Sequence, residues 1–293
     1  MFKKISKHLV ITLSIIVMAF FNIFAPYYIT FIFPSSNKMI IGVDYYIDSE
    51  VAIAEDLEAM NIVGIKVIKI ELLCEPNSLT DYTNNRTKVF FEQISFYDFK
   101  IAVKVMREDV WKLGYYLEHW GDKIDYIQVL NEPELIQGFG EGALLLDDEI
   151  FTPVRQIISN VTAYNVANNG NISMYTNFSP AFLLRTNIVQ FYSNFTEIKF
   201  LGFDVYMDIG IQTTPFIDLA LRRLSGRETI VTEFGISTLD ENKKTEFVIS
   251  GLNFFKAYGY KQCWLLYWNG QEYEISGTKL EVALKEWIKD NGA

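Results

Sequence analysis

Two glutamates stand at places in the chain where their side chains could do acid–base and nucleophilic chemistry. Residues 126–133 read YIQVLNEP, an apolar run that ends in an amide, the carboxylate of Glu132 and a proline. The run is short and contains β-branched residues, which favours a buried strand, and Pro133 predicts its end because proline lacks an N–H. Residues 228–235, ETIVTEFG, repeat the pattern with Glu233. Two carboxyl groups at the ends of two buried strands are the reagents that cleave a glycosidic bond.

The elements that must position these glutamates alternate between strand and helix signals. We expect strands at residues 39–46, 64–73, 100–106, 126–130, 172–176, 200–206, 228–232 and 262–268. We expect helices at residues 49–61, 87–99, 109–120, 148–167, 181–195, 215–224, 240–258 and 278–290. The spacing of about 32 residues per unit fits an α/β chain folded as a (β/α)8 TIM barrel of ~250 residues, better than an open doubly wound sheet. Because the carboxyl ends of barrel strands converge, Glu132 and Glu233 should share one mouth.

The first 38 residues differ in composition from the rest. Three lysines precede an uncharged run over residues 9–33. As a helix this run would be about 37 Å long at ~1.5 Å per residue, enough to cross a bilayer core of ~30 Å. The basic flank predicts a cytoplasmic amino terminus. We therefore expect an N-terminal transmembrane helix that acts as a signal-anchor, a short link, and a barrel over residues 39–293 on the extracellular side.

The same run could instead be a signal peptide, which would leave a secreted barrel. If the run is an anchor, the short link to the first strand places the closed face of the barrel toward the membrane, so the mouth should point away from it. Five Asn-x-Ser/Thr sequons are compatible with an exported domain. They lie at Asn85, Asn160, Asn171, Asn177 and Asn194.

Composition narrows the classes of partner. The formal net charge of −10 disfavours nucleic acid and suits a neutral carbohydrate. Two histidines are too few for His-based metal sites or His-centred triads, so we expect no metal and no cofactor. Cys74 and Cys263 fall at opposite ends of their expected strands, which predicts two free thiols. We expect a monomer.

Two motifs resemble those of a known family. Asn131-Glu132-Pro133 and Thr232-Glu233-Phe234-Gly235 resemble the acid/base and nucleophile motifs of glycoside hydrolase clan A. This clan comprises retaining (β/α)8 glycosidases such as cellulases, mannanases and xylanases, and the likeness extends over residues 39–290. It implies hydrolysis of O-glycosidic bonds in a poly- or oligosaccharide by double displacement. Glu132 would be the acid/base, Glu233 the nucleophile, and Asn131 would bind the sugar 2-OH.

The resemblance also implies roles for other residues. Tyr206 would donate its hydroxyl hydrogen to the nucleophile. Trp268 would lie beneath the sugar ring and stack against it, while Trp264 belongs to the core. Lys69 stands where many clan members carry arginine, and lysine cannot form the bidentate fork of a guanidinium. Asp204 stands where the clan often has histidine. These two departures mark a divergent member.

Residues at other strand ends could line the cleft. We expect Tyr45 and Tyr46 after the first strand, and Asn177 after the fifth strand, to do so. A glycan on Asn177 would obstruct the mouth, so that sequon should be unused.

Two other functional classes stay open. A barrel at the cell surface could bind carbohydrate without cleaving it. A barrel enzyme of another class, such as a lyase or aldolase, would need a strand-end lysine as its nucleophile, and Lys69 and Lys104 are the candidates.

Overall fold

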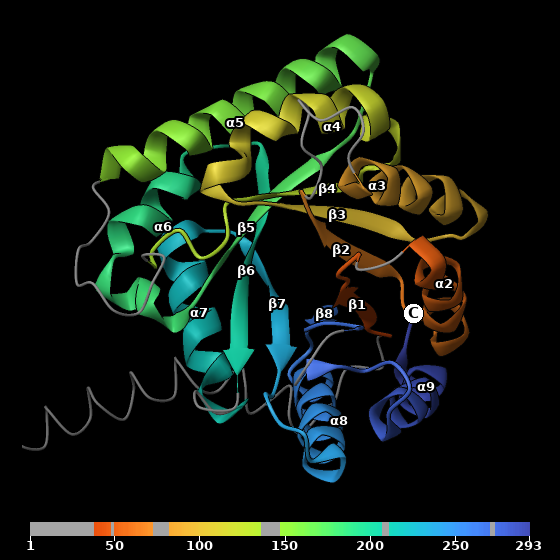
Figure 1. The fold of residues 1–293 in the computed structure, drawn as a ribbon. Helices are drawn as coiled ribbons and strands as arrows, with labels where there is room; N and C mark the ends of the chain where they lie inside the picture. Colours follow the sequence, from red (N-terminus) through yellow and green to blue (C-terminus); the bar gives the residue numbers. More distant parts are fainter. Residues whose placement is uncertain (1–37, 48–49, 73–81, 136–146, 207–210, 270–272) are drawn as a thin grey trace, which may run out of the picture.

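The computed structural model describes residues 38–47, 50–72, 82–135, 147–206, 211–269 and 273–293. These residues form a closed barrel in which parallel strands follow one another in sequence order around the axis, with helices outside (Figure 1). The strands are β1 (Ile40–Asp44), β2 (Val67–Glu71), β3 (Lys100–Val105), β4 (Tyr126–Val129), β5 (Ser173–Phe178), β6 (Ile198–Tyr206), β7 (Glu228–Gly235) and β8 (Gln262–Leu265). The predicted (β/α)8 barrel is confirmed.

The outer layer follows the predicted order of helices. It contains α2 (Glu50–Val63), α3 (Tyr82–Gln93), α4 (Leu113–Trp120), α5 (Asp147–Asn168), α6 (Thr186–Ser193), α7 (Thr214–Ser225), α8 (Glu241–Ala257) and α9 (Lys279–Asn291). Short 3-10 turns precede three of them: η2 (Arg107–Lys112) before α4, η4 (Pro180–Leu184) before α6 and η5 (Ile211–Thr213) before α7. Because each connection from strand to strand crosses outside the sheet, every mouth-side loop begins at the carboxyl end of a strand.

The interior of the barrel is divided into an apolar and a polar layer. Side chains alternate between the two faces of a strand, so one set points at the barrel axis and the other at the helices. The apolar layer around the axis is formed by Val67, Ala102, Tyr175, Ile230 and Trp264. Trp264 is fully buried there, which confirms its predicted core position. Two residues further along several strands, the inward positions carry Lys69, Lys104, Asn177 and Asp204, and this polar layer lies toward the mouth.

Strand β7 contains one residue more than its neighbours require. Phe203 on β6 pairs with Val231, but the next residue, Asp204, pairs with Glu233, so Thr232 has no partner in the register. The same extra residue appears against β8, between Val231 and Phe234. This is a β-bulge, which changes the direction of the side chains that follow it.

The bulge aims Glu233 at the barrel axis. Ile230 faces the axis, so strict alternation would point Glu233 at the helices. Instead Glu233 turns inward and Phe234 packs outward against α8. Gly202 on β6 makes room for the bulge, because a Cβ there would lie 2.3 Å from the Thr232 side chain.

Five strands end earlier than predicted, and two of them, the fourth and the eighth, end close to a residue with a left-handed backbone. We expected the fourth and eighth strands to reach residues 130 and 268, but they stop at Val129 and Leu265. Leu130 and Tyr267 have left-handed backbones, with φ of 62° and 42°, and such a residue cannot continue a strand. Both irregular residues adjoin the mouth.

The two ends of the described barrel meet at its closed face. Met39 forms an isolated parallel bridge with Gly292, and the backbone N–H of Ala293 donates to the Met39 carbonyl at 3.1 Å. The predicted transmembrane segment (9–33) lies outside the described residues. Within the described ranges, no helix is long and apolar enough to span a bilayer.

Of the two predicted free thiols, Cys74 lies outside the described residues. Cys263 is buried and not bonded to another cysteine. The glycine-rich loop after the fourth strand also lies outside them.

Candidate active site

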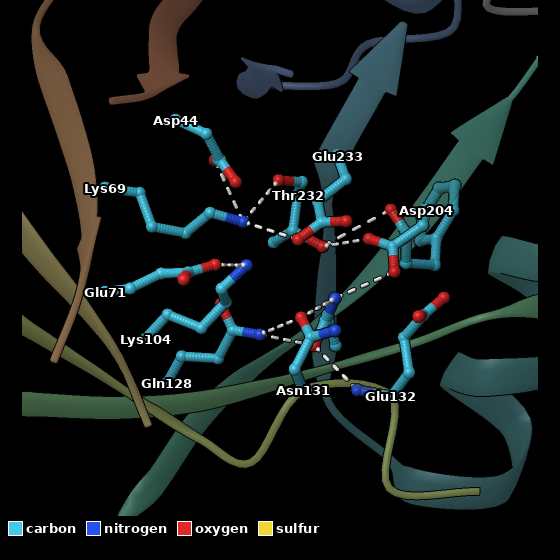
Figure 2. A network of polar contacts seen from close by, with 12 residues as sticks. Asp44, Lys69, Glu71, Lys104, Gln128, Asn131, Glu132, Asp204, Thr232 and Glu233 are labelled. Carbon is cyan, nitrogen blue, oxygen red and sulfur yellow. Dashed lines mark hydrogen bonds and ion pairs between the residues drawn. The ribbon is translucent and has the colours of Figure 1, made fainter. Parts of the chain in front are cut away.

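Glu233 lies at the centre of the polar layer and both of its oxygens accept hydrogen bonds. Lys69 Nζ donates to Oε1 at 2.8 Å, and the Tyr206 hydroxyl donates to Oε2 at 2.6 Å. Lys69 Nζ also lies 2.9 Å from Oδ1 of Asp44 (Figure 2). The side chains of Asp44, Lys69 and Glu233 are almost completely buried. The sequence predicted the contact of Tyr206 with Glu233, and the structure confirms it.

These contacts set the charge state of Glu233. Burial by itself would raise the pKa of the Glu233 carboxyl, but the ammonium groups of Lys69 and Lys104 and the two hydrogen bonds lower it to about 2. Burial would lower the pKa of Lys69, but the carboxylates of Asp44 and Glu233 raise it above its ordinary value. Glu233 is therefore an anion over the working pH range of most enzymes.

Replacing Lys69 by methionine is expected to shift the acid side of the pH profile. If Glu233 is the nucleophile that the resemblance implies, it must be ionised to attack, so activity should fall as the pH drops through its pKa. Removal of the buried cation should raise that pKa by about 1–3 units, and the acid limb of kcat/KM should move up by the same amount. Titration of kcat/KM from acid to neutral pH measures the shift.

The matched control is Lys261→Met, which removes an exposed ion pair with Glu228 at the closed face. It should leave the acid limb where it is. An acid limb that is equal in Lys69→Met and wild type would mean that Lys69 does not control the ionisation of Glu233.

Glu132 is presented by a strained loop after β4. Leu130 and Glu132 both have left-handed backbones, with φ of 62° and 41°, on either side of Asn131. Non-glycine residues adopt this conformation only where surrounding contacts hold it, and such strain collects at functional sites. One holding contact is the backbone N–H of Glu132, which donates to Oδ1 of Asn177 at 3.2 Å.

Asn177 and Gln128 hold Asn131 in place. Gln128 donates through Nε2 to Oδ1 of Asn131 at 2.8 Å and to Oδ1 of Asn177 at 2.6 Å. Asn177 donates through Nδ2 to Asn131 at 3.2 Å. Asn177 is fully buried, so it supports the residues of the cleft from beneath instead of lining it. A buried amide leaves no space for a glycan, which supports the expectation that this sequon is unused.

The Glu132 carboxyl has the opposite electrostatic environment from Glu233. Burial raises the pKa of Glu132 to about 6, and the negative charge of Glu233 adds to the increase. The two glutamates therefore interact at one mouth, one as an anion and the other able to hold a proton near neutral pH. Figure 2 shows both in the same hollow, with Asp204 between them in this view.

Comparison with known proteins identifies the fold. No protein-family model matches the sequence, and no curated protein matches it. A β-glycosidase structure has a TM-score of 0.64 at 13% identity, covering 84% of this chain and 88% of its own. The chain shares the (β/α)8 barrel fold of that β-glycosidase.

Two further solved structures show the same architecture. An endo-1,4-β-D-mannanase from Thermotoga petrophila RKU-1 has a TM-score of 0.62 at 11% identity, with 86% of this chain and 99% of that chain covered. A β-glucosidase from Thermotoga maritima has a TM-score of 0.60 at 11% identity, with coverage of 84% and 88%. At these identities the likeness establishes the fold alone.

Two aromatic residues that were expected to line the cleft do not line it. Trp268 is fully buried in the core between barrel and helices, and its backbone N–H donates to the Asp44 carbonyl at 2.7 Å. The left-handed Tyr267 changes the phase of the chain, so Trp268 turns outward. Tyr45 is also buried, and its hydroxyl donates to Asp56 on α2 at 2.9 Å. Strand alternation requires this, because the adjacent Asp44 faces inward.

Tyr267, two residues after the end of β8, lies near the charged layer. Its side chain is partly exposed. Burial raises the pKa of its hydroxyl, and the charges of Lys104, Asp44 and Glu233 also act on it. Tyr46 is 44% exposed, consistent with a place on the rim. Tyr267 was missed because only the backbone dihedral, which the sequence does not reveal, distinguishes it from its neighbour.

Two more charged residues belong to the mouth: Lys104, which the sequence offered only as a candidate amine nucleophile, and Asp44, which sequence reasoning missed. Lys104 is buried and its ammonium lies 2.5 Å from Oε1 of Glu71. Burial raises the pKa of Asp44 to about 7, although Lys69 opposes the increase. Strand periodicity was the available signal, because Asp44 and Lys104 occupy inward positions near strand ends.

Glu134 anchors the loop that carries Glu132. It is almost fully buried, and its Oε1 accepts a hydrogen bond from the backbone N–H of Ser179, at the start of η4. Burial raises the pKa of Glu134 to about 8. This contact ties the loop after β4 to the loop after β5.

The electrostatics disfavour the lyase or aldolase alternative. An amine nucleophile needs a lowered pKa so that it is neutral near pH 7. Although burial lowers the pKa values of Lys69 and Lys104, neighbouring carboxylates raise both above their ordinary value. Both lysines are ion-paired cations.

Proposed function

We propose that the chain is a retaining glycoside hydrolase that cleaves O-glycosidic bonds of a poly- or oligosaccharide by double displacement. The observation that carries this proposal is that two glutamates meet at one mouth in opposite environments: Lys69 and Tyr206 bind the Glu233 carboxylate and lower its pKa, whereas burial raises the pKa of Glu132. Two carboxyls whose environments separate them in this way divide the roles of nucleophile and acid.

In the first step, the Glu233 carboxylate attacks the anomeric carbon. The bond from that carbon to the leaving oxygen breaks, and Glu132 transfers its proton to this oxygen. A glycosyl ester on Glu233 and a Glu132 carboxylate result. Lys69 and Tyr206 hold the Glu233 carboxylate in one orientation before attack, which reduces the entropic cost of reaching the transition state.

In the second step, Glu132 takes a proton from water as the water oxygen attacks the anomeric carbon. The ester bond to Glu233 breaks, and Glu233 leaves as a carboxylate. The same cation and hydroxyl that lower the pKa of Glu233 make it a good leaving group here. Two inversions at one carbon give retention of configuration.

Two residues are placed to bind the sugar. Asn131 accepts hydrogen bonds at its oxygen, so its NH2 group is the end suited to donate to the sugar 2-OH, a contact that strengthens as the transition state forms. The ring of Tyr267 takes the platform role that was expected of Trp268. The similar solved structures include a β-glucosidase and an endo-β-mannanase, which supports a β-linked hexose substrate.

The proposal is tested with the full chain on soluble β-glucans, mannans, xylans and galactans, and on aryl β-glycosides. Reducing sugar should be released, and NMR of the earliest product should show the anomer of the substrate. A carbohydrate-binding barrel would bind one of these sugars, release nothing and be unaffected by Glu233→Gln. Product of the opposite anomer would exclude double displacement.

We further propose that residues 9–33 anchor the barrel to a membrane, with the barrel at residues 39–293 on the extracellular side. The position of Met39 at the closed face supports a mouth directed away from the bilayer. The full chain should stay in the membrane fraction after carbonate washing, whereas a chain that begins at Lys38 should not. Amino-terminal sequencing of the exported protein distinguishes this from secretion after signal cleavage, in which the mature chain begins beyond the apolar run.

A further inference from the structure

Asp204 is a buried carboxyl whose hydrogen-bond donors are neutral. It is fully buried on β6. Thr232 Oγ1 donates to its Oδ1 at 3.1 Å, and Asn177 Nδ2 donates to its Oδ2 at 2.7 Å. An ionised carboxylate buried with neutral donors alone is costly, and such a group tends to keep its proton.

The nearby cations are engaged with other carboxylates. Lys69 pairs with Asp44 and Glu233, and Lys104 pairs with Glu71. The negative charge of Glu233, on the neighbouring strand β7, further disfavours a second anion beside it.

Glu132 faces Asp204 from the loop after β4 (Figure 2), and the Asp204 side chain influences the pKa of Glu132. Ionised carboxylates have no hydrogen to donate, so a hydrogen bond between two carboxyls requires that one of them holds a proton. Asp204 is the more deeply buried of the two, and Glu132 is partly exposed.

The groups that surround Asp204 favour a proton on Asp204 instead of on Glu132. They are Asn177 from β5, Thr232 and Glu233 from β7, Glu132 from the loop after β4, and Lys69 from β2. Burial, followed by the charges of Glu233 and Glu132, raises the pKa of Asp204 well above its ordinary value, with Lys69 opposing. The Asp204 side chain opposes the effect of burial on the pKa of Glu132.

We propose, on the basis of the glycosidase function above, that Asp204 is a neutral carboxylic acid that donates a hydrogen bond to the Glu132 carboxylate. It is a positioning residue. Its proton stays on Asp204 throughout, while Glu132 gives its own proton to the leaving oxygen and later takes one from water. The donated hydrogen bond stabilises the Glu132 anion that exists between the two steps, and keeps it oriented as the base.

The proposal predicts different results for two substitutions of Asp204. Asp204→Asn keeps a neutral donor, because the NH2 group of asparagine can take the place of the acid O–H. The Thr232 hydroxyl, which donates to Asp204 in the wild type, can then donate to the Phe203 carbonyl, 3.4 Å away. Its kcat/KM should stay within about threefold of wild type, with the basic limb unmoved. Asp204→Leu removes the donor, so the Glu132 anion is less stable, the basic limb should rise by about one pH unit, and hydrolysis of the glycosyl ester should slow by about tenfold.

If Asp204 were an anion, removing its charge would lower the pKa of Glu132. The basic limb would then move to lower pH in both variants, and this result would overturn the proposal. Asp56→Asn is the matched control, since Asp56 is a partly buried carboxyl on α2 that binds Tyr45. It should not move the basic limb.

Infrared difference spectroscopy at pH 7.5 gives a reading that needs neither activity nor a folded leucine variant. The wild-type protein should show the C=O stretch of a protonated carboxylic acid that Asp204→Asn lacks and Asp56→Asn retains. Equal spectra for wild type and Asp204→Asn would refute the proposal. If the wild type hydrolyses no sugar, the proposed glycosidase function fails while the infrared result still decides the protonation of Asp204.

Discussion

Replacing Glu233 with glutamine is expected to lower kcat by more than about 10⁴-fold, the scale on which loss of a nucleophile acts. An amide oxygen is a poor nucleophile and a glycosyl imidate does not lead to normal hydrolysis. Lys69 would remain paired with Asp44, and the amide oxygen could still accept a hydrogen bond, so the fold should survive. The loss should therefore fall on the chemical step, with little change in sugar binding.

The measurement is kcat and Kd for the same substrate in wild type and variant, with Glu228→Gln as control. Glu228 begins the same strand at the closed face and is exposed, so its replacement should not affect activity. A fluorinated sugar that traps the ester should label the wild type at Glu233, as read by mass spectrometry of peptides. If Glu233→Gln keeps activity within tenfold of wild type, Glu233 is not the nucleophile.

Replacing Glu132 with alanine is expected to slow cleavage by about 10²–10⁴-fold for substrates with poor leaving groups. The first step needs a proton from Glu132 only when the leaving oxygen is basic. An aryl glycoside with an acidic phenol should therefore still form the glycosyl ester, which then accumulates because the base for the second step is missing. Azide, which needs no base, should restore turnover and give a glycosyl azide of retained configuration.

The pH dependence of kcat/KM follows from the ionisation of Glu132. Glu132 must hold its proton in the first step, so wild-type kcat/KM should fall as the pH rises above about 6. The alanine variant should lack this basic limb with the aryl glycoside. A basic limb that persists at pH 6 in Glu132→Ala, or azide that leaves turnover unchanged, would assign the acid/base role to another group.

Local sequence was sufficient to locate the elements and the two glutamates. Short apolar runs that end in Pro133 or in a glycine read as buried strands, and their even spacing predicted the barrel, because burial of a parallel strand on both faces demands such runs. The contact between Tyr206 and Glu233 was implied by the resemblance to clan A, and the structure contains it. Lys69 occupies a site expected to hold arginine, and the structure shows that a single Nζ still reaches both Asp44 and Glu233.

The aromatic residues show where local reasoning failed. Trp268 was assigned to the cleft from the resemblance and Tyr45 from its place after a strand, but neither tells which way a side chain points. Direction depends on the phase of the pleat, and one left-handed residue at Tyr267 reverses it. The choice between Trp268 and Tyr267 therefore needed the backbone itself.

The sequence by itself determined that eight buried runs alternate with helices and that two of them end in carboxylates, because these are properties of composition and period. Only the tertiary structure decided that Glu233 faces the axis, since the bulge at Thr232 reverses the pleat and depends on the space left by Gly202 on another strand. The separation of the two glutamate pKa values was likewise decided by tertiary structure. It arises from burial and from charges on β2 and β3, and electrostatic energy depends on distance in space, which sequence separation does not specify.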